Sequence, residues 1–405
     1  MQSREIRKQF LDFFKKQAHV IIPSASLVPK NDPSVLFTTA GMQQFKSYYI
    51  SKADAQKDLN SLNVASSQKC VRTSDIEEVG DKSHLTFFEM LGNFSFGGYW
   101  KKEAIEYAHE LITKDFGLKI DFISVFGGAD NIPEDKESAD IWKSIDSSII
   151  IKKFGREDNF WGPTGEEGPC GPTTEIYVGG IEIWNIVFNE YYQSRDKELT
   201  PLKIRGVDTG MGLERLTFVT QGVSSAFETD LFESIIKRIK DISSVSEEKA
   251  ERIVSDHIRT SVFMIADGVI ASNTGRGYIL RRLIRRAVRY ADILGIAPGE
   301  LFHVARSVIL KYRDIYPELA KSSERIEKEI LAEENKFRKT LREGLKQFEK
   351  GVDSFILFTT YGFPIELTEE IAREKGGIVD KDKFYKQLKE HQELSRKSSG
   401  QKFKK

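Results

Sequence analysis

The sequence contains few cysteines, no excess of charge of either sign and no long apolar run. Its 405 residues include two cysteines, Cys70 and Cys170, which excludes a disulfide scaffold and predicts a reducing, cytoplasmic location. Neither cysteine lies in a Cys-x-x-Cys pair or in a Cys/His cluster with zinc spacing, so no zinc is expected. No apolar run approaches the roughly 18 residues needed to cross a bilayer, and no membrane partner is expected.

The charge is balanced, with 61 Lys and Arg against 61 Asp and Glu. This balance excludes a uniformly basic nucleic-acid coat protein but leaves room for a locally basic surface. The chain also lacks the Gly-x-x-x-x-Gly-Lys-Ser/Thr phosphate loop. It fails the dinucleotide fingerprint as well, because the sixth position of the run that starts at Gly210 is Arg215 rather than glycine. Any nucleotide would therefore have to be bound by side chains.

What is present predicts a folded protein of two domains and a tail. Hydrophobic residues make up 40% of the chain and aromatic residues 11%, enough for a sizeable core. The first residues form an amphipathic helix, not a signal peptide, with Ile6, Phe10, Phe13 and Phe14 on one face.

Residues 1–225 alternate between short β-rich runs and turn clusters, which predicts an α+β domain. The β-rich runs are Val35–Thr39, Ile120–Phe126 and Ile181–Phe188, and the turns include Asn31-Asp32-Pro33 and Gly127-Gly128. Residues 226–375 show helical periodicity and predict a helical domain. Residues 376–405 predict a short helix followed by a disordered basic tail, because the last 25 residues hold nine Lys and Arg against three Asp and Glu.

The segment 203–216 has features of a site for a phosphate-bearing ligand. A strand-like run stops at Asp208, Gly210 and Gly212 permit close approach of the backbone, and a helix begins with Arg215 in its first turn. The plainer interpretation is an ordinary strand-to-helix turn with a surface arginine.

The segment 67–100 reads as a hairpin. Arg72 ends an alternating strand, and after a polar loop His84 leads into a second strand that carries Phe88, Glu89 and Met90. Aromatic and thioether side chains beside a carboxylate could hold a purine ring and its amino group. Hydrophobic core is the alternative, and it accounts for at least half of the phenylalanines here.

The segment 158–190 combines a glycine- and proline-rich turn around Trp161 with a strand. Strict alternation in this strand places Glu182 on one face and Asn185 with Val187 on the other. Asn185, polar among apolar neighbours, needs a partner, which is either a buried backbone group or a small polar ligand beside Val187.

The helical half contains the basic run RRLIRRAVRY. Its five arginines occupy a stripe of about 140° when residues are plotted roughly 100° apart, so one face packs and the other could meet phosphate; these are Arg281, Arg282, Arg285, Arg286 and Arg289. The polar loop before this run, residues 272–276, could read a base pair. A solvated arginine face is the alternative.

Taken together, these segments resemble the signature motifs of class II aminoacyl-tRNA synthetases. The strings CVR, TFFEMLGNFSFG, GPCGP, EIWNIVF, VDTGMGLER, DHIR and GRGY are similar, nearly word for word, to those of the alanyl-tRNA synthetases. The resemblance covers residues 1 to about 395. It implies an α+β fold, with an antiparallel sheet of six to seven strands followed by a helical tRNA-recognition domain. It also implies ATP-dependent activation of L-alanine and transfer of the alanyl group to alanine tRNA.

The resemblance also implies roles for individual residues. Arg72 would bind the α-phosphate of ATP and Arg215 the γ-phosphate, as the two catalytic residues, with the nucleotide further contacted by His84, Phe88, Glu89, Met90 and Gly212. The alanine pocket would comprise Trp161, Asn185, Val187, Asp208 and Gly210. Mg²⁺ would accompany ATP, with Glu175 and Glu182 as candidate ligands. Contacts to the tRNA acceptor stem would come from Asn273, Arg276, Arg281, Arg282 and Arg285.

The sequence departs from the family pattern in three places. The loop after Arg72 reads TSDIEEVG and lacks the usual lysine, Leu85 replaces a histidine, and Thr359 replaces the aspartate expected to pair with Asn273 in reading the acceptor stem. No motif of the family's editing or oligomerisation domains is found, so we expect a monomer that does not edit in cis. Two other functions stay open: a paralogue that loads a carrier other than tRNA, and a non-catalytic tRNA-binding relative.

Overall fold

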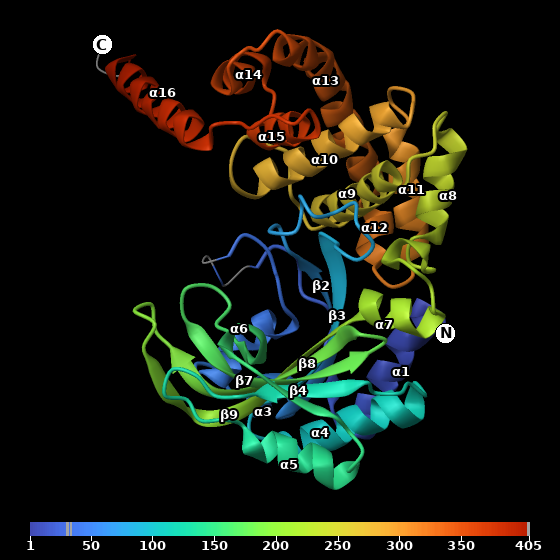
Figure 1. Cartoon of the computed structure of the whole chain (residues 1–405), viewed down its shortest axis with the longest axis vertical. Coiled ribbons are helices and arrows are strands. Elements are labelled where there is room, and N and C mark those ends of the chain that lie inside the picture. The colour runs from blue at the N-terminus through green and yellow to red at the C-terminus, as the bar shows by residue number, and fades with distance from the viewer. Residues whose placement is uncertain (30–31, 33–34, 403–405) are drawn as a thin grey trace.

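The computed structural model describes residues 1–29, 32 and 35–402. Figure 1 shows a half built around one β-sheet in the lower part of the view and a half built of helices above it. Among the described residues, no helix has both the length and the apolar character to cross a membrane. The turn expected at Asn31-Asp32-Pro33 falls largely outside the described residues.

The described strands form one nine-stranded sheet with an antiparallel centre. In sheet order the strands are β1 (Val20–Ile21), β2 (Asn63–Val71), β3 (Phe87–Ser95), β9 (Leu199–Gly212), β8 (Ile181–Gln193), β7 (Gly168–Val178), β4 (Phe122–Phe126) and β5 (Ile151–Phe154), while β6 (Phe160–Trp161) pairs with β7. The expected hairpin is β2 with β3.

The expected α+β class is confirmed, and the sheet is larger than six to seven strands. The short strands β1 and β5 lie parallel to β2 and β4 and extend the sheet at its two edges. Residues 35–39, expected as a strand, form none. Instead, Thr38 makes separate hydrogen bonds, from its N–H to the carbonyl of Leu27 and from its hydroxyl to the carbonyl of Ser26.

Helices of the first half pack against the sheet and contribute to two apolar clusters, the larger of which continues into the helical half. They are α1 (Ser3–Lys16), α2 (Lys46–Tyr49), α3 (Ala55–Leu59), α4 (Lys101–Glu110), α5 (Lys136–Ile145), α6 (Arg156–Asn159) and α7 (Leu213–Gln221), with short helical turns at η1 (Gly41–Phe45), η2 (Leu111–Asp115) and η3 (Ala226–Glu228). The α1 face expected to be apolar is buried, and Phe10 meets Trp184 of β8 with ring centroids 6.1 Å apart. On α5, the Trp142 indole donates to Thr174 of β7 over 2.9 Å.

The second half is helical, as the periodicity predicts. It contains α8 (Glu233–Ile242), α9 (Glu248–Ala266), α10 (Gly275–Ile293), α11 (Leu301–Tyr312), α12 (Pro317–Lys321), α13 (Ser323–Glu349), α14 (Ser354–Tyr361), α15 (Ile365–Glu374) and α16 (Lys381–Lys402). Helix α16 projects away from the other helices in Figure 1 and continues to residue 402, so most of the segment expected as a disordered tail is helical.

The two halves meet along strands β2 and β3. The Phe87 ring of β3 stacks on Phe263 of α9 with ring centroids 4.0 Å apart. Lys69 of β2, 3% exposed, makes ion pairs with Asp267 over 3.0 Å and with Glu318 over 2.7 Å. Both strands of the expected hairpin, β2 and β3, therefore contact the helical half directly.

One glycine in the sheet gives a stability prediction. A Cβ on Gly171 of β7 would lie 1.8 Å from the carbonyl oxygen of Phe188 on β8, whereas a Cβ on Gly155 would meet nothing within 4 Å. Overpacking against a paired strand cannot be relieved by a side-chain rotation, so Gly171→Ala should lower the free energy of unfolding by about 1 to 3 kcal/mol or more. Gly155→Ala should change it by about 0.5 kcal/mol at most. Denaturant unfolding of both variants tests this, and equal effects would show that β7 and β8 can separate locally.

Candidate functional site

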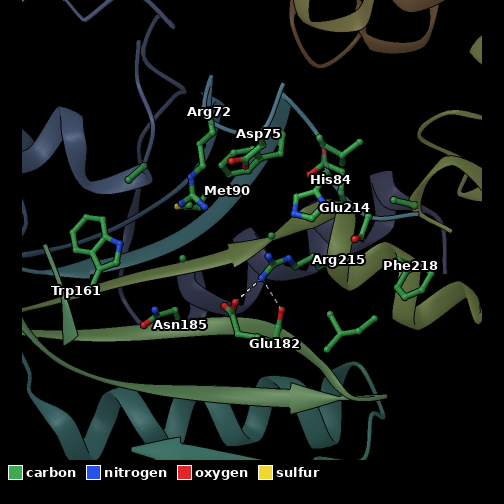
Figure 2. A pocket seen from close by; sticks show the side chains of 18 of the residues that line it. Arg72, Asp75, His84, Met90, Trp161, Glu182, Asn185, Glu214, Arg215 and Phe218 are labelled. Atoms are coloured by element: carbon green, nitrogen blue, oxygen red, sulfur yellow. Dashed lines mark hydrogen bonds and ion pairs between the residues drawn. The ribbon is translucent and has the colours of Figure 1, made fainter. Parts of the chain in front are cut away.

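A cavity of about 550 Å³ opens on the face of the sheet beside the loop between β2 and β3. This volume is within the range of small-molecule sites. It brings together twelve residues singled out from the sequence: Arg72, His84, Phe88, Met90, Trp161, Glu182, Asn185, Val187, Asp208, Gly210, Gly212 and Arg215. Figure 2 labels Arg72, His84, Met90, Trp161, Glu182, Asn185 and Arg215 among them. They come from several segments of the chain, the outermost of which contain Arg72 and Arg215.

One wall of the cavity is built on the neighbouring strands β8 and β9. In their register Val187 lies opposite Asp208, and Asn185 lies opposite Gly210. The Asp208 side chain is 5% exposed, and burial raises its pKa to about 8. No described side chain donates a hydrogen bond to it in the structure. A buried carboxylate without a partner suits a small cationic ligand group, which would restore its negative charge.

Asn185 supplies a second polar group to the same part of the cavity. Its amide nitrogen donates to Glu175 over 3.2 Å, while its amide oxygen is buried without a hydrogen-bond partner among the described residues. An orphaned buried acceptor indicates a missing donor. Across the strands, a Cβ on Gly210 would lie 2.9 Å from the Met90 sulfur, so there is no room for a side chain at this position.

A bulge in β8 corrects the expected placement of Glu182. Ile176 of β7 pairs with Trp184, but the next residue, Tyr177, pairs with Glu182, so Ile183 is an extra residue in the strand. The bulge breaks the strict alternation that placed Glu182 and Asn185 on opposite faces. Both residues therefore line the cavity, as Figure 2 shows.

Two arginines, Arg72 and Arg215, line the rest of the cavity. The Arg72 guanidinium lies over the Phe88 ring, 5.0 Å from its centroid. In the first turn of α7, Arg215 donates to the Glu182 carbonyl over 3.1 Å and makes an ion pair with its carboxylate (Figure 2). The Arg215 side chain is half exposed. His84 is held by Asp81, whose carboxylate lies 2.6 Å from Nδ1. This arrangement suits an anionic ligand beside an aromatic surface.

Glu89 does not lie in the cavity, contrary to its expected contact with a purine. It follows Phe88 on β3, so its side chain points to the opposite face, where it is fully buried. Arg7 donates to it over 2.9 and 2.7 Å, and the Tyr316 hydroxyl donates over 2.8 Å. Its pKa is lowered because the charges and hydrogen bonds of these partners outweigh the effect of burial, so it is an ionised structural group.

Glu175, proposed as a metal ligand, also lies outside the cavity lining. Besides Asn185 it accepts hydrogen bonds from Ser124 over 3.0 Å and from Tyr177 over 2.8 Å. Burial and the nearby Glu182 raise its pKa to about 7. Among the described residues, no three His, Cys, Asp or Glu side chains gather as a metal site. Of the two candidates, only Glu182 has a carboxylate at the cavity.

Three charged residues of the cavity escaped the sequence reasoning: Asp75, Lys82 and Glu214. Lys82 lies two residues after the stretch TSDIEEVG, which lacks the usual lysine. Its backbone carbonyl accepts a hydrogen bond from the Ala226 N–H over 3.0 Å. Glu214 precedes Arg215 and bonds to Arg259 of α9 and to the backbone N–H of Glu89 over 3.0 Å. The only sequence feature that indicates a place for Lys82 in the cavity is its position two residues before His84.

The basic run of the helical half is not a solvent-facing stripe. Three of its arginines, Arg285, Arg286 and Arg289, are less than 10% exposed. Arg285 donates to Glu333 over 2.8 Å and to the Gly362 carbonyl over 2.7 Å. The sequence interpretation is wrong for these three residues because acidic side chains of α13 and α15 cover the helix and pair with them.

Of the other residues proposed to contact nucleic acid, Asn273 is exposed and Arg276 is partly exposed, whereas the side chains of Arg281 and Arg282 are largely buried. The Asn273 amide oxygen accepts from Arg281, which also donates to Glu333 over 3.0 Å. Arg276 donates to the Leu36 carbonyl. Arg282 pairs with Glu77 of the loop between β2 and β3. A ligand at this surface would meet Asn273 and Arg276 before the paired arginines.

Comparison with known proteins gives consistent matches along the chain. The family model described as tRNA synthetases class II (A) matches residues 5–405. Alanine–tRNA ligases from Borrelia hermsii, Thermotoga maritima and Treponema denticola are 42%, 44% and 45% identical, over 99 to 100% of this chain. The chain spans 74% of the Borrelia and Treponema proteins and 50% of the Thermotoga protein.

Similarity to solved structures is weaker. Pyrrolysyl-tRNA synthetase from Desulfitobacterium hafniense aligns with 56% of this chain and 72% of its own, at 11% identity and a TM-score of 0.36. The assignment therefore rests on the sequence matches, which are long and continuous. The chain belongs to the alanine–tRNA ligase family of class II aminoacyl-tRNA synthetases.

Proposed function

We propose that this chain activates L-alanine with ATP and transfers the alanyl group to the 3′ end of alanine tRNA. The observation that carries the proposal is the division of the cavity. A buried, unpartnered carboxylate, Asp208, lies opposite Val187 in a part with little room, and the arginines Arg72 and Arg215 line the remainder. Family membership supports the same activity.

In the proposed reaction an oxygen of the alanine carboxylate attacks the α-phosphorus of ATP. The bond from that phosphorus to the bridging oxygen breaks, and pyrophosphate leaves with the electron pair. A ribose hydroxyl of the tRNA then attacks the alanyl carbonyl carbon, its proton passes to solvent, and AMP leaves. Neither step needs a side-chain nucleophile, so orientation and charge stabilisation account for the catalysis.

The residues of the cavity have distinct proposed tasks. Asp208 and the free oxygen of Asn185 would hold the alanine ammonium, while Val187 and Trp161 would enclose its methyl group. Phe88 and Met90 would contact the adenine. Arg72 and Arg215 would bind phosphate oxygens. Lys82 would add a third positive charge and so replace the family lysine that is missing from the earlier part of the same loop.

Mg²⁺ fits this site as a companion of ATP. Such ions are typically held by one or two carboxylates together with phosphate oxygens, and Glu182 offers one carboxylate at the cavity. Glu175 does not fit, because its carboxylate is buried and already used. When bound, Mg²⁺ would neutralise charge on the phosphates of ATP.

Acceptor-stem recognition is proposed for the exposed loop before α10. Asn273 keeps its amide nitrogen free to donate, since Arg281 occupies the amide oxygen. Arg276 and Arg282 would contact the backbone of the stem. Arg285 is withdrawn from this role, since it is buried and paired.

Two assays test the proposed function. The wild-type chain should catalyse ATP–pyrophosphate exchange that depends on alanine, and it should charge an alanine tRNA transcript. A pocket that excludes only one methylene or one hydroxyl discriminates by about 1 to 3 kcal/mol, so glycine and serine should support slower but measurable exchange. Exchange without charging would favour a paralogue that uses another carrier, and tRNA binding without exchange would favour a non-catalytic relative.

The pH dependence of alanine use should report Asp208. Because burial raises its pKa to about 8, the side chain is neutral below that pH and cannot balance the ammonium. The kcat/KM for alanine should therefore increase as the pH rises through about 8. Asp208→Asn should lower kcat/KM by about ten- to a hundredfold and remove this increase. Asp75→Asn, a second carboxylate of the cavity, should retain it; an unchanged pH profile in Asp208→Asn would refute the assignment.

Substitution of Arg72 or Arg215, the two arginines proposed to bind phosphate, should reduce ATP–pyrophosphate exchange far more than substitution of a surface arginine. Removing Arg72 or Arg215 deletes charge stabilisation in the transition state, which costs about 3 to 4 kcal/mol for each group. Arg72→Ala and Arg215→Ala should therefore lose nearly all measurable exchange. Arg205→Ala is the matched control, because Arg205 is exposed and lies outside the cavity. Near-normal exchange in either cavity variant would disprove its proposed role.

A further inference from the structure

The loop between β2 and β3, residues 72–86, is shared between the cavity and the helical half. Asp75 near its start and Lys82, Ser83 and His84 near its end line the cavity. The stretch between them, residues 76–80, turns away from the cavity, and Ile76 and Val79 are buried in the main core. The position of the cavity residues therefore depends on what holds this middle stretch.

Arg286 of α10 holds the middle stretch of the loop, residues 76–80, by hydrogen bonds to its backbone carbonyls. Its guanidinium donates to the Ile76 carbonyl over 2.8 Å and to the Val79 carbonyl over 3.3 and 3.4 Å. It also pairs with Glu370 of α15 over 2.8 Å, and it is 5% exposed. A planar guanidinium can satisfy two carbonyls and a carboxylate at once, which a lysine ammonium cannot match in geometry.

The same arginine is connected to the end of the loop by a buried chain of hydrogen bonds. Arg286 donates to Nε2 of His257 over 2.8 Å, so Nδ1 carries the ring proton and donates to Asp256 over 2.9 Å. The other oxygen of Asp256 accepts from the backbone N–H of Thr86 over 2.9 Å. His257 and Asp256 are fully buried on α9. The middle and the end of the loop are thus fixed by one network that belongs entirely to the helical half.

We propose that Arg286 is a positioning residue that sets the geometry of the nucleotide part of the cavity from the helical half. It touches neither cavity nor substrate; it acts by fixing residues 76–80, and through them Asp75, Lys82 and His84. The inference rests on the proposed function, because the nucleotide part is assigned there. It follows that a shift of α10 would move this loop.

Arg289 provides a matched comparison on the same helix. It is 7% exposed and pairs with Glu370 over 3.4 Å and with Glu374, so it resembles Arg286 in burial and in its acidic partners. None of its contacts among the described residues reaches the loop. A purely structural contribution of a buried arginine should therefore appear at both positions, while an effect on the nucleotide should appear only at Arg286.

The test compares Arg286→Lys with Arg289→Lys in steady-state ATP–pyrophosphate exchange. The lysine in Arg286→Lys keeps the charge and the pairing with Glu370, so the variant is expected to fold, but it cannot hold both loop carbonyls. It should raise the KM for ATP by about five- to tenfold and change the KM for alanine by less than about twofold. Arg289→Lys should change both values by less than about twofold. Equal changes in both KM values, or equal changes in both variants, would overturn the proposal.

A second measurement does not depend on activity. Hydrogen–deuterium exchange of the ligand-free protein should show faster exchange of the amides of residues 76–80 and of Thr86 in Arg286→Lys than in Arg289→Lys or the wild type. Unchanged protection in Arg286→Lys would overturn the proposal even if the KM for ATP is raised. If the wild type lacks alanine-dependent exchange, the proposed function fails, and this measurement still decides whether Arg286 fixes the loop.

Discussion

The alternation of side chains along β3 is the constraint on which both halves depend. Phe88 and Met90 face the cavity, while Phe87 and Glu89 face the opposite side of the sheet. Glu89 binds Arg7 of the N-terminal helix and Tyr316 of the helical half, and Phe87 stacks on Phe263 of α9. A single strand thus lines the cavity with one face and joins three distant segments of the chain with the other.

This arrangement makes the polar contacts between the halves selective for one geometry. Lys69, Glu214 and Arg259 are almost fully buried, and each has an oppositely charged partner in the other half: Lys69 pairs with Asp267 and Glu318, and Glu214 pairs with Arg259. Burying ions in pairs brings little net stability, but removing one partner leaves a charge uncompensated and is costly. We infer that these pairs serve mainly to exclude other placements of α9 and α12 on the sheet.

Much of this could be predicted from sequence, for identifiable reasons. The β2–β3 hairpin and the helical second half follow from local periodicity and turn residues, and twelve residues of the cavity can be singled out because their motifs are contiguous. The strand run expected to stop at Asp208 continues to Gly212, because β9 stays paired with β3 as far as that residue. The sequence groups Glu89 with its motif neighbours Phe88 and Met90, which face the cavity, because its own partners, Arg7 and Tyr316, are remote in the chain. The arginine run was misread for the same reason: the acidic residues that cover it lie on α13 and α15, and helical periodicity shows a face but not what packs on it.

The bulge at Ile183 has a consequence for how this strand can vary. Because the extra residue reverses the alternation, Glu182 and Asn185 share a face although they are three positions apart. Deleting Ile183 would remove the reversal and move Glu182 and Arg215 out of their contact, without altering any residue that lines the cavity. The number of residues between Glu182 and Asn185 on β8 therefore matters to the site as much as the chemistry of these two side chains. Inserting or deleting one residue there is not equivalent to the same change in a surface loop.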